Sequence, residues 1–208
     1  MNYLPQIITV AGIHLLAVMS PGPDFIMISR NSLVYSRRVG IYSAVGLGLG
    51  ILVHVTYSLV GIGLIISKSI LLFSILKFIG AGYLIYIGYK SLRANPEKIR
   101  TLSTERREDI GKAKAIRLGF LTNVLNPKAT LFFFALFTQV INPNIPKSIQ
   151  TLMGIEMSMM TFVWFALVAT VLSHKHIKNR FISVQHYFER TFGLILIALG
   201  IKVALSSK

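Results

Sequence analysis

The feature that most constrains this chain is a series of six long apolar segments. An apolar run of about 18 residues or more is long enough to cross the hydrocarbon core of a bilayer as a helix. Such runs fill most of the 208 residues and leave no room for a separate soluble domain. We therefore expect an all-α membrane protein with one polytopic domain over residues 1–208. The expected spans are Leu4–Ile28, Ile41–Ile66, Ile70–Tyr89, Leu118–Val140, Ile149–Ser173 and Phe188–Ser206.

The distribution of basic residues predicts the topology of these spans. The formal net charge is +15, and most of the 22 Lys and Arg residues follow the first, third and fifth spans. In a soluble protein such a charge would suggest nucleic-acid binding. Cytoplasmic loops of membrane proteins, however, carry the excess of Lys and Arg. We therefore expect basic loops in the cytoplasm, both termini outside, and no nucleic-acid partner.

The chain divides into two halves of three spans each. They cover residues 4–89 and 118–206, and a polar cytoplasmic loop, 90–117, joins them. Their last spans end alike, with Gly88-Tyr89-Lys90 in the first half and Gly200-Ile201-Lys202 in the second. Because three is an odd number of spans, the second half would insert upside down. The sequence therefore predicts two inverted three-helix repeats, a recurring design of secondary transporters.

The first span of each half is broken by proline beside polar residues. The first break reads Ser20-Pro21-Gly22-Pro23-Asp24 and the second reads Asn126-Pro127-Lys128. Proline lacks an N–H group and frees a backbone carbonyl, which in a membrane must be buried in protein or face a water-filled cavity. Helix N-termini attract carboxylates, and helix C-termini attract cations. Paired breaks therefore indicate a transporter site suited to an amino acid zwitterion. Kinked helices with a packing role alone are the alternative.

The residues of both breaks are the expected substrate-binding residues. From the span ends alone, the first break lies nearer the inside and the second nearer the midplane. The substrate-binding residues would be Ser20, Pro21, Gly22, Pro23, Asp24, Asn126, Pro127 and Lys128.

Ionisable residues inside spans are functional hypotheses by default. We assign proton coupling or gating to Asp24, Glu156, Lys77 and His14. For Asp24 the alternative is an N-cap of the half-helix that follows the first break. Lys77 and Glu156 would form an outer gate or be solvated separately, and His14 would line the pathway or be a hydrogen-bonded core residue.

The sequence contains no motif for a metal, a cofactor or an enzyme active site. It has no cysteine, and the lone histidines His14 and His54 have no second ligand at metal-binding spacing. The segment Gly46-Leu47-Gly48-Leu49-Gly50 lies within a span and predicts close helix packing rather than phosphate binding. We expect Phe132-Phe133-Phe134 to face lipid.

Three motifs point to a known family. They are Met19-Ser-Pro-Gly-Pro-Asp24, Gly80-Ala-Gly-Tyr-Leu-Ile-Tyr-Ile-Gly-Tyr-Lys90 and Gly119-Phe-Leu-Thr-Asn-Val-Leu-Asn-Pro-Lys-Ala129. These motifs resemble the LysE/RhtB family of amino-acid exporters. Within that family, Ile13-His-Leu-Leu-Ala-Val-Met-Ser-Pro-Gly-Pro-Asp24 and Glu156 ahead of Trp164 are most similar to the threonine/homoserine efflux branch.

The resemblance implies a carrier in the bacterial inner membrane that exports small amino acids and is coupled to the proton gradient. Its partners would be the amino-acid substrate and the lipid bilayer, and a homo-oligomer is compatible with this interpretation. Two other classes remain as alternatives. They are a cation or metal permease, and a membrane scaffold without transport activity.

Overall fold

The computed structural model describes most of the chain, and all of its regular structure there is α-helical, which confirms the predicted all-α class. The described residues are 3–68, 70–93, 107–139, 145–173, 187, 190–191, 193–198, 200–202 and 204–205. Among them, the side chains at 62–74, 76–77 and 138–139 are outside the description.

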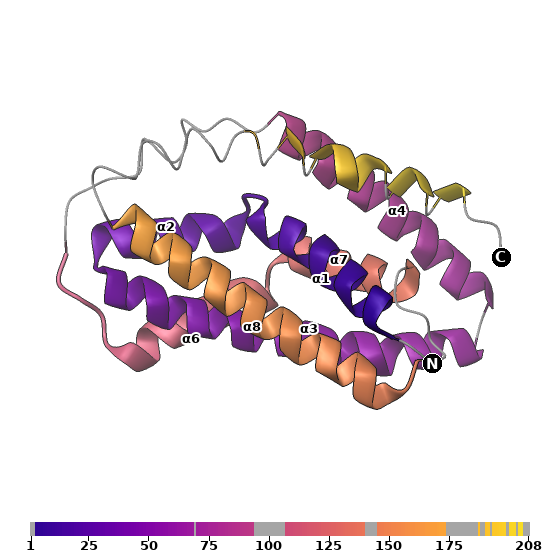
Figure 1. Cartoon of the computed structure of the whole chain (residues 1–208), viewed down its shortest axis with the longest axis horizontal. Coiled ribbons are helices and arrows are strands. Elements are labelled where there is room, and N and C mark those ends of the chain that lie inside the picture. The colour runs from indigo at the N-terminus through magenta and orange to yellow at the C-terminus, as the bar shows by residue number, and fades with distance from the viewer. Residues whose placement is uncertain are drawn as a thin grey trace.

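Figure 1 shows the helices in their order along the chain. They are α1 (Leu4–Met19), α2 (Pro23–Val34), α3 (Arg37–Lys68), α4 (Ile70–Leu92), α6 (Lys112–Val124), α7 (Pro127–Gln139) and α8 (Lys147–Leu172). A further apolar helical segment covers Gly193–Lys202. Of the connector predicted at 90–117, α4 includes the residues up to Leu92 and α6 those from Lys112, and residues 94–106 lie outside the description.

Both predicted breaks are real bends in the backbone. The axes of α1 and α2 differ by 57°, and those of α6 and α7 differ by 56°. Among the described residues, two unbroken helices are long and apolar enough to cross a membrane, namely Arg37–Gly61 of α3 and the whole of α8. The number rises to 4 if each bent pair is one span. The expected spans Ile70–Tyr89 and Phe188–Ser206 include residues outside the description, so six spans in inverted repeats stay a prediction.

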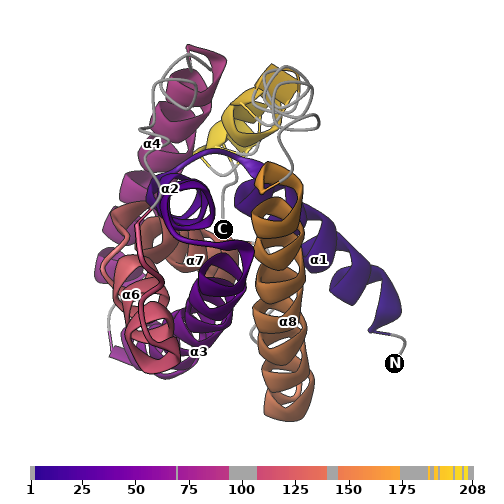
Figure 2. The same cartoon turned by 90° about the vertical axis from the view of Figure 1, so that its left-hand side faces the viewer.

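Helix α3 lies between α6 and α8 and packs closely on both (Figure 2). A Cβ atom on Gly46 would lie 2.0 Å from the backbone oxygen of Ile116 on α6. On the other side, the Ser158 hydroxyl of α8 donates to the backbone oxygen of Gly48 at 2.8 Å. The predicted role of these glycines in close helix packing is therefore confirmed.

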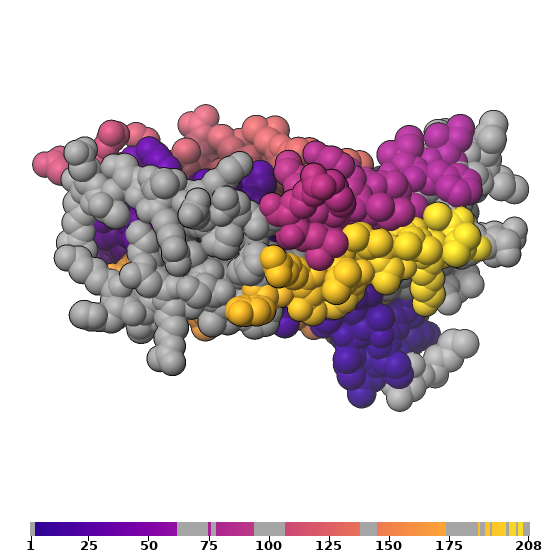
Figure 3. Space-filling view, turned by 90° about the horizontal axis from the view of Figure 1, so that it is seen from above, coloured from indigo at the N-terminus to yellow at the C-terminus, as the bar shows by residue number. Residues whose placement is uncertain are grey.

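The C-terminal helical segment packs on α4 rather than on α3. Figure 3 shows the two side by side on one face of the molecule. Backbone atoms meet there, because a Cβ on Gly193 would lie 2.6 Å from the oxygen of Gly88, and one on Gly200 would lie 2.8 Å from that of Ala81.

The interior contains two apolar clusters, and the helix breaks lie between them. One cluster includes Ile51 and Phe133, and the other includes Phe25 and Phe165. Residues from both clusters line the cavity beside the breaks. The polar groups of the breaks thus lie next to apolar side chains of both clusters, and hydrogen bonds of buried groups are stronger than those in water.

Candidate functional site

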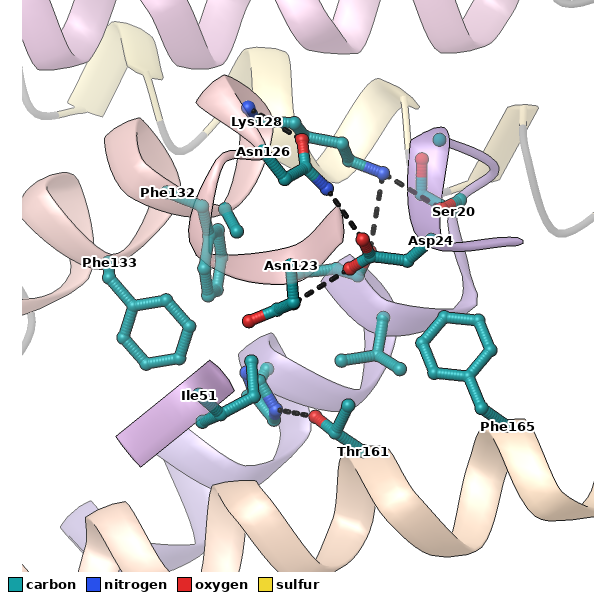
Figure 4. A pocket seen from close by; sticks show the side chains of 15 residues that line it. Ser20, Asp24, Ile51, Asn123, Asn126, Lys128, Phe132, Phe133, Thr161 and Phe165 are labelled. Carbon is teal, nitrogen blue, oxygen red and sulfur yellow. Dashed lines mark hydrogen bonds between the residues drawn. The ribbon is translucent and has the colours of Figure 1, made fainter. Parts of the chain in front are cut away.

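The two helix breaks meet at Asp24, in the first turn of α2. Asn123 donates from Nδ2 to Oδ2 of Asp24 at 2.8 Å, and Asn126 donates from Nδ2 to its Oδ1 at 3.1 Å. Figure 4 shows both amides directed at the carboxylate. Each oxygen of Asp24 therefore has a donor from the α6–α7 break, although the span ends had placed the breaks at different depths.

The orientation of the Asn126 amide follows from its position at the start of α7. Its Oδ1 accepts the backbone N–H of Lys128 at 3.0 Å, which is the hydrogen bond of an N-cap residue. The amide nitrogen must then point the other way, toward Asp24. Asp24 itself is not an N-cap: Gly22 holds that position on α2, so the capping alternative for Asp24 was wrong.

Lys128 binds the carbonyl end of α1. Its Nζ donates to the backbone oxygen of Ser20 at 2.8 Å, to that of Pro21 at 3.3 Å and to that of Ala17 at 3.4 Å. In an unbroken helix the oxygen of Ala17 would accept the N–H of residue 21, which proline lacks. The C-terminal end of a helix also carries partial negative charge. The ammonium group thus replaces donors that the first break removed, and it interacts electrostatically with Asp24.

His54 does the same for the second break. The oxygen of Asn123 accepts the backbone N–H of Asn126 at 2.9 Å, but it has no partner at Pro127, four residues later, because proline has no N–H. The Nε2 atom of His54 lies 3.0 Å from this oxygen, and the Nδ1 atom is hydrogen-bonded to the Tyr57 hydroxyl. The His54 ring also stacks on Phe133, with 5.5 Å between ring centroids.

Sequence reasoning missed Asn123 as a site residue. A polar residue four positions before a proline in an apolar segment is a signal that could have identified it.

A cavity of about 430 Å³, including its open part, lies beside these hydrogen bonds. The end at Asp24 and Lys128 is polar, and the rest is lined mainly by aromatic and aliphatic side chains, with His14 and Thr161 among them (Figure 4). Phe132 and Phe133 are buried in this lining, so the prediction that they face lipid was wrong. The main lining residues are His14, Ser20, Asp24, Ile51, Asn123, Asn126, Lys128, Phe132, Phe133, Thr161 and Phe165.

The other predicted site residues have different positions. His14 lines the cavity and is buried. Glu156 on α8 lies outside the cavity lining, and one of its carboxylate oxygens is buried without a hydrogen-bond partner among the described residues. Lys77 is on α4, but its side chain is outside the description, so its predicted pairing with Glu156 stays a prediction.

The described part of the chain offers no cluster of metal ligands. Within it, no group of three or more His, Asp and Glu side chains could hold a metal ion. The polar end of the cavity instead combines one carboxylate, one ammonium group and backbone carbonyls. This set of groups suits a small organic ion that carries charges of both signs.

Comparison with known proteins gives one family model and several relatives. Residues 15–207 match the family model of the LysE type translocators. The uncharacterized membrane protein YrhP of Bacillus subtilis is 30% identical over 199 residues, which cover 91% of this chain and 93% of that protein. The threonine efflux protein of Escherichia coli K12 is 27% identical over 200 residues, which cover 96% and 97% of the two chains. An uncharacterized membrane protein of Haemophilus influenzae is 26% identical over 191 residues. No solved structure gives a significant match.

Proposed function

The chain belongs to the LysE type translocator family, and we propose on that premise that it exports small amino acids, with the joined helix breaks as its substrate site. The family consists of translocators, in agreement with the expectation that the protein is not an enzyme. Its apolar helices and membrane-protein relatives support a membrane location. Similarity to a threonine efflux protein favours substrates of the size of threonine or homoserine.

The observation that carries the proposal is the pairing of opposite charges at one end of the cavity. Asp24 and the carbonyl end of α1 attract a cation, and Lys128 attracts an anion. In the proposed bound state the substrate ammonium replaces that of Lys128 at the α1 carbonyls and beside Asp24. Lys128 then turns to the substrate carboxylate, which also faces the N-terminus of α2 at Gly22.

The transport cycle follows from the predicted inverted repeats. Rocking of one three-helix repeat against the other would open the cavity to each side in turn. In this proposal the protein lies in the bacterial inner membrane, with both termini outside and the basic loops in the cytoplasm. Asp24 and Glu156 are the two acids assigned to proton coupling, Asp24 because it lies in the site and Glu156 because one of its oxygens is buried without a partner in the described structure.

Counterflow in proteoliposomes tests the proposal. The purified protein is reconstituted with unlabelled amino acid inside, and the uptake of labelled threonine, homoserine, leucine or lysine is measured. We expect uptake of threonine and homoserine above that of protein-free liposomes. Absence of exchange with every amino acid would refute amino-acid export, whereas exchange of leucine or lysine alone would refute the substrate size proposed here.

A further inference from the structure

His14 on α1 is a buried histidine whose hydrogen bonds determine its tautomer. It is 1% exposed, and its Nε2 atom lies 3.1 Å from the backbone oxygen of Met157 and 3.0 Å from the hydroxyl of Thr161, both on α8. A carbonyl oxygen can only accept, so Nε2 carries the hydrogen. In the neutral ring, Nδ1 is then a hydrogen-bond acceptor that only a donor can satisfy.

That acceptor has no donor within the described part of the chain. The Nδ1 atom of His14 is buried and has no hydrogen-bond partner among the residues that the structure describes. His54 is equally buried, but both of its ring nitrogens have partners. Leaving a buried acceptor unpaired costs about 1–3 kcal/mol, and native proteins leave few such groups. The difference between the two histidines indicates that the Nδ1 atom of His14 receives its hydrogen bond from a group other than the described residues.

The position of His14 indicates what that group is. His14 and Thr161 both line the cavity whose other end holds Asp24 and Lys128. His14 and Ser20 are six residues apart, which is about 9 Å along a helix. A small amino acid bound by its charged groups at Asp24 and Lys128 would therefore extend its side chain along the cavity in the direction of His14.

We propose that His14, supported by Thr161, forms the subsite that recognises a hydroxyl group on the substrate side chain. The inference rests on the proposed export of amino acids and deepens it. The substrate hydroxyl donates to Nδ1 of His14, while Nε2 keeps its hydrogen bonds to α8. A site built to bind a hydroxyl group rejects analogues that lack it, because its buried polar atoms are then left unpaired. Threonine is thus distinguished from valine, which has a methyl group in place of the hydroxyl.

The transport test compares competitors within each variant. Exchange of labelled alanine is measured against unlabelled threonine and valine, and the ratio of their inhibition constants is the readout, so a general loss of rate does not affect it. We expect threonine to compete at least about tenfold better than valine in the unmodified protein, which corresponds to about 1.4 kcal/mol. His14→Phe, which keeps a ring but has no acceptor, should bring the ratio close to one.

Matched variants separate recognition from packing. His14→Gln supplies both an acceptor and a donor and should restore most of the preference for threonine. Thr161→Val should lower the preference, because the cavity loses a hydroxyl, whereas Thr9→Val on the exposed face of α1 should not change it. Alanine exchange in which threonine and valine compete equally in the unmodified protein would overturn the inference and leave the proposed function standing.

A second readout does not depend on transport. In ¹⁵N NMR of histidine-labelled protein, with the His14 signals assigned by their absence in His14→Gln, the Nδ1 signal of His14 should shift on addition of threonine and not of valine. Such a shift without any exchange would refute export while supporting the hydroxyl subsite. The inference would be overturned if threonine left the Nδ1 signal unchanged, or if the signal showed that the hydrogen is on Nδ1 instead of Nε2. Because this measurement uses the unmodified protein, it remains decisive if His14→Phe fails to fold.

Discussion

His54 on α3 lies with its Nε2 atom 3.0 Å from the backbone oxygen of Asn123 at the end of α6. An unbroken helix would fill this position with the N–H of residue 127, which is proline. The side chain of Asn123 in turn donates to Asp24 on α2. One histidine on a third helix therefore stabilises the carbonyl end of α6 and, through Asn123, the carboxylate of the candidate site.

Replacing His54 by leucine should weaken both the fold and the site. The oxygen of Asn123 loses the donor of His54 but keeps the backbone N–H of Asn126, and a typical hydrogen bond contributes about 0.5–1.5 kcal/mol to stability. We expect a lower melting temperature in detergent and an increase of about tenfold in the KM for threonine counterflow, since Asn123 would no longer be held against Asp24.

His54→Gln is the matched control, because a glutamine amide can place a donor near the position of the histidine Nε2. It should recover most of the lost affinity. If His54→Leu changes the melting temperature and leaves the KM as it was, His54 has a structural role only, and the connection through Asn123 does not reach the site.

Asp24→Asn should abolish amino-acid exchange without unfolding the protein. The substitution removes the negative charge, and one oxygen acceptor becomes an amide that cannot accept from Asn123 or Asn126. We expect counterflow to fall at least about 100-fold, with normal amounts of protein in the membrane. Asp109→Asn is the control, because Asp109 accepts a hydrogen bond from Ser36 at an exposed site away from the cavity. Equal exchange by the two variants would exclude Asp24 from the substrate site.

Lys128→Met should abolish exchange and also lower stability. The variant keeps most of the apolar stem but leaves the oxygens of Ala17, Ser20 and Pro21 without the ammonium donor. The measurements are counterflow and the melting temperature in detergent. Lys147→Met changes a lysine at the exposed start of α8 and should affect neither. Unimpaired counterflow by Lys128→Met would contradict the assignment of Lys128 to the substrate carboxylate.

The helix breaks could be predicted from sequence because their causes are local. Hydropathy over about 20 residues identifies an apolar helix, and a proline disrupts it whatever surrounds it. Pro21 and Pro127 were therefore correctly interpreted as breaks. The residues next to them, Asp24 and Lys128, line one cavity, and their predicted role in substrate binding stays a prediction.

The partners of these residues depend on helix packing, which hydropathy does not describe. Nothing near Lys128 in the sequence indicates that its ammonium group binds the end of α1. The burial of Phe133 beside His54 likewise follows from where α7 packs on α3. Phe133 looks the same in the sequence whether it faces lipid or a cavity, which is why its environment was predicted wrongly.

Close packing of α3 on α6 gives a last prediction. A Cβ atom on Gly46 would lie 2.0 Å from the backbone oxygen of Ile116, and a backbone oxygen cannot rotate away as a side chain can. Gly46→Ala should therefore separate the two helices and destabilise the protein by more than about 3 kcal/mol, which is the upper range for overpacked substitutions.

Gly61, on the same helix, has no heavy atom within 4 Å of an added Cβ among its described neighbours. Gly61→Ala should be neutral or stabilise by up to about 1 kcal/mol, because alanine favours a helix over glycine. Thermal unfolding in detergent compares the two variants, and equal melting temperatures would show that α3 and α6 are not held at this distance.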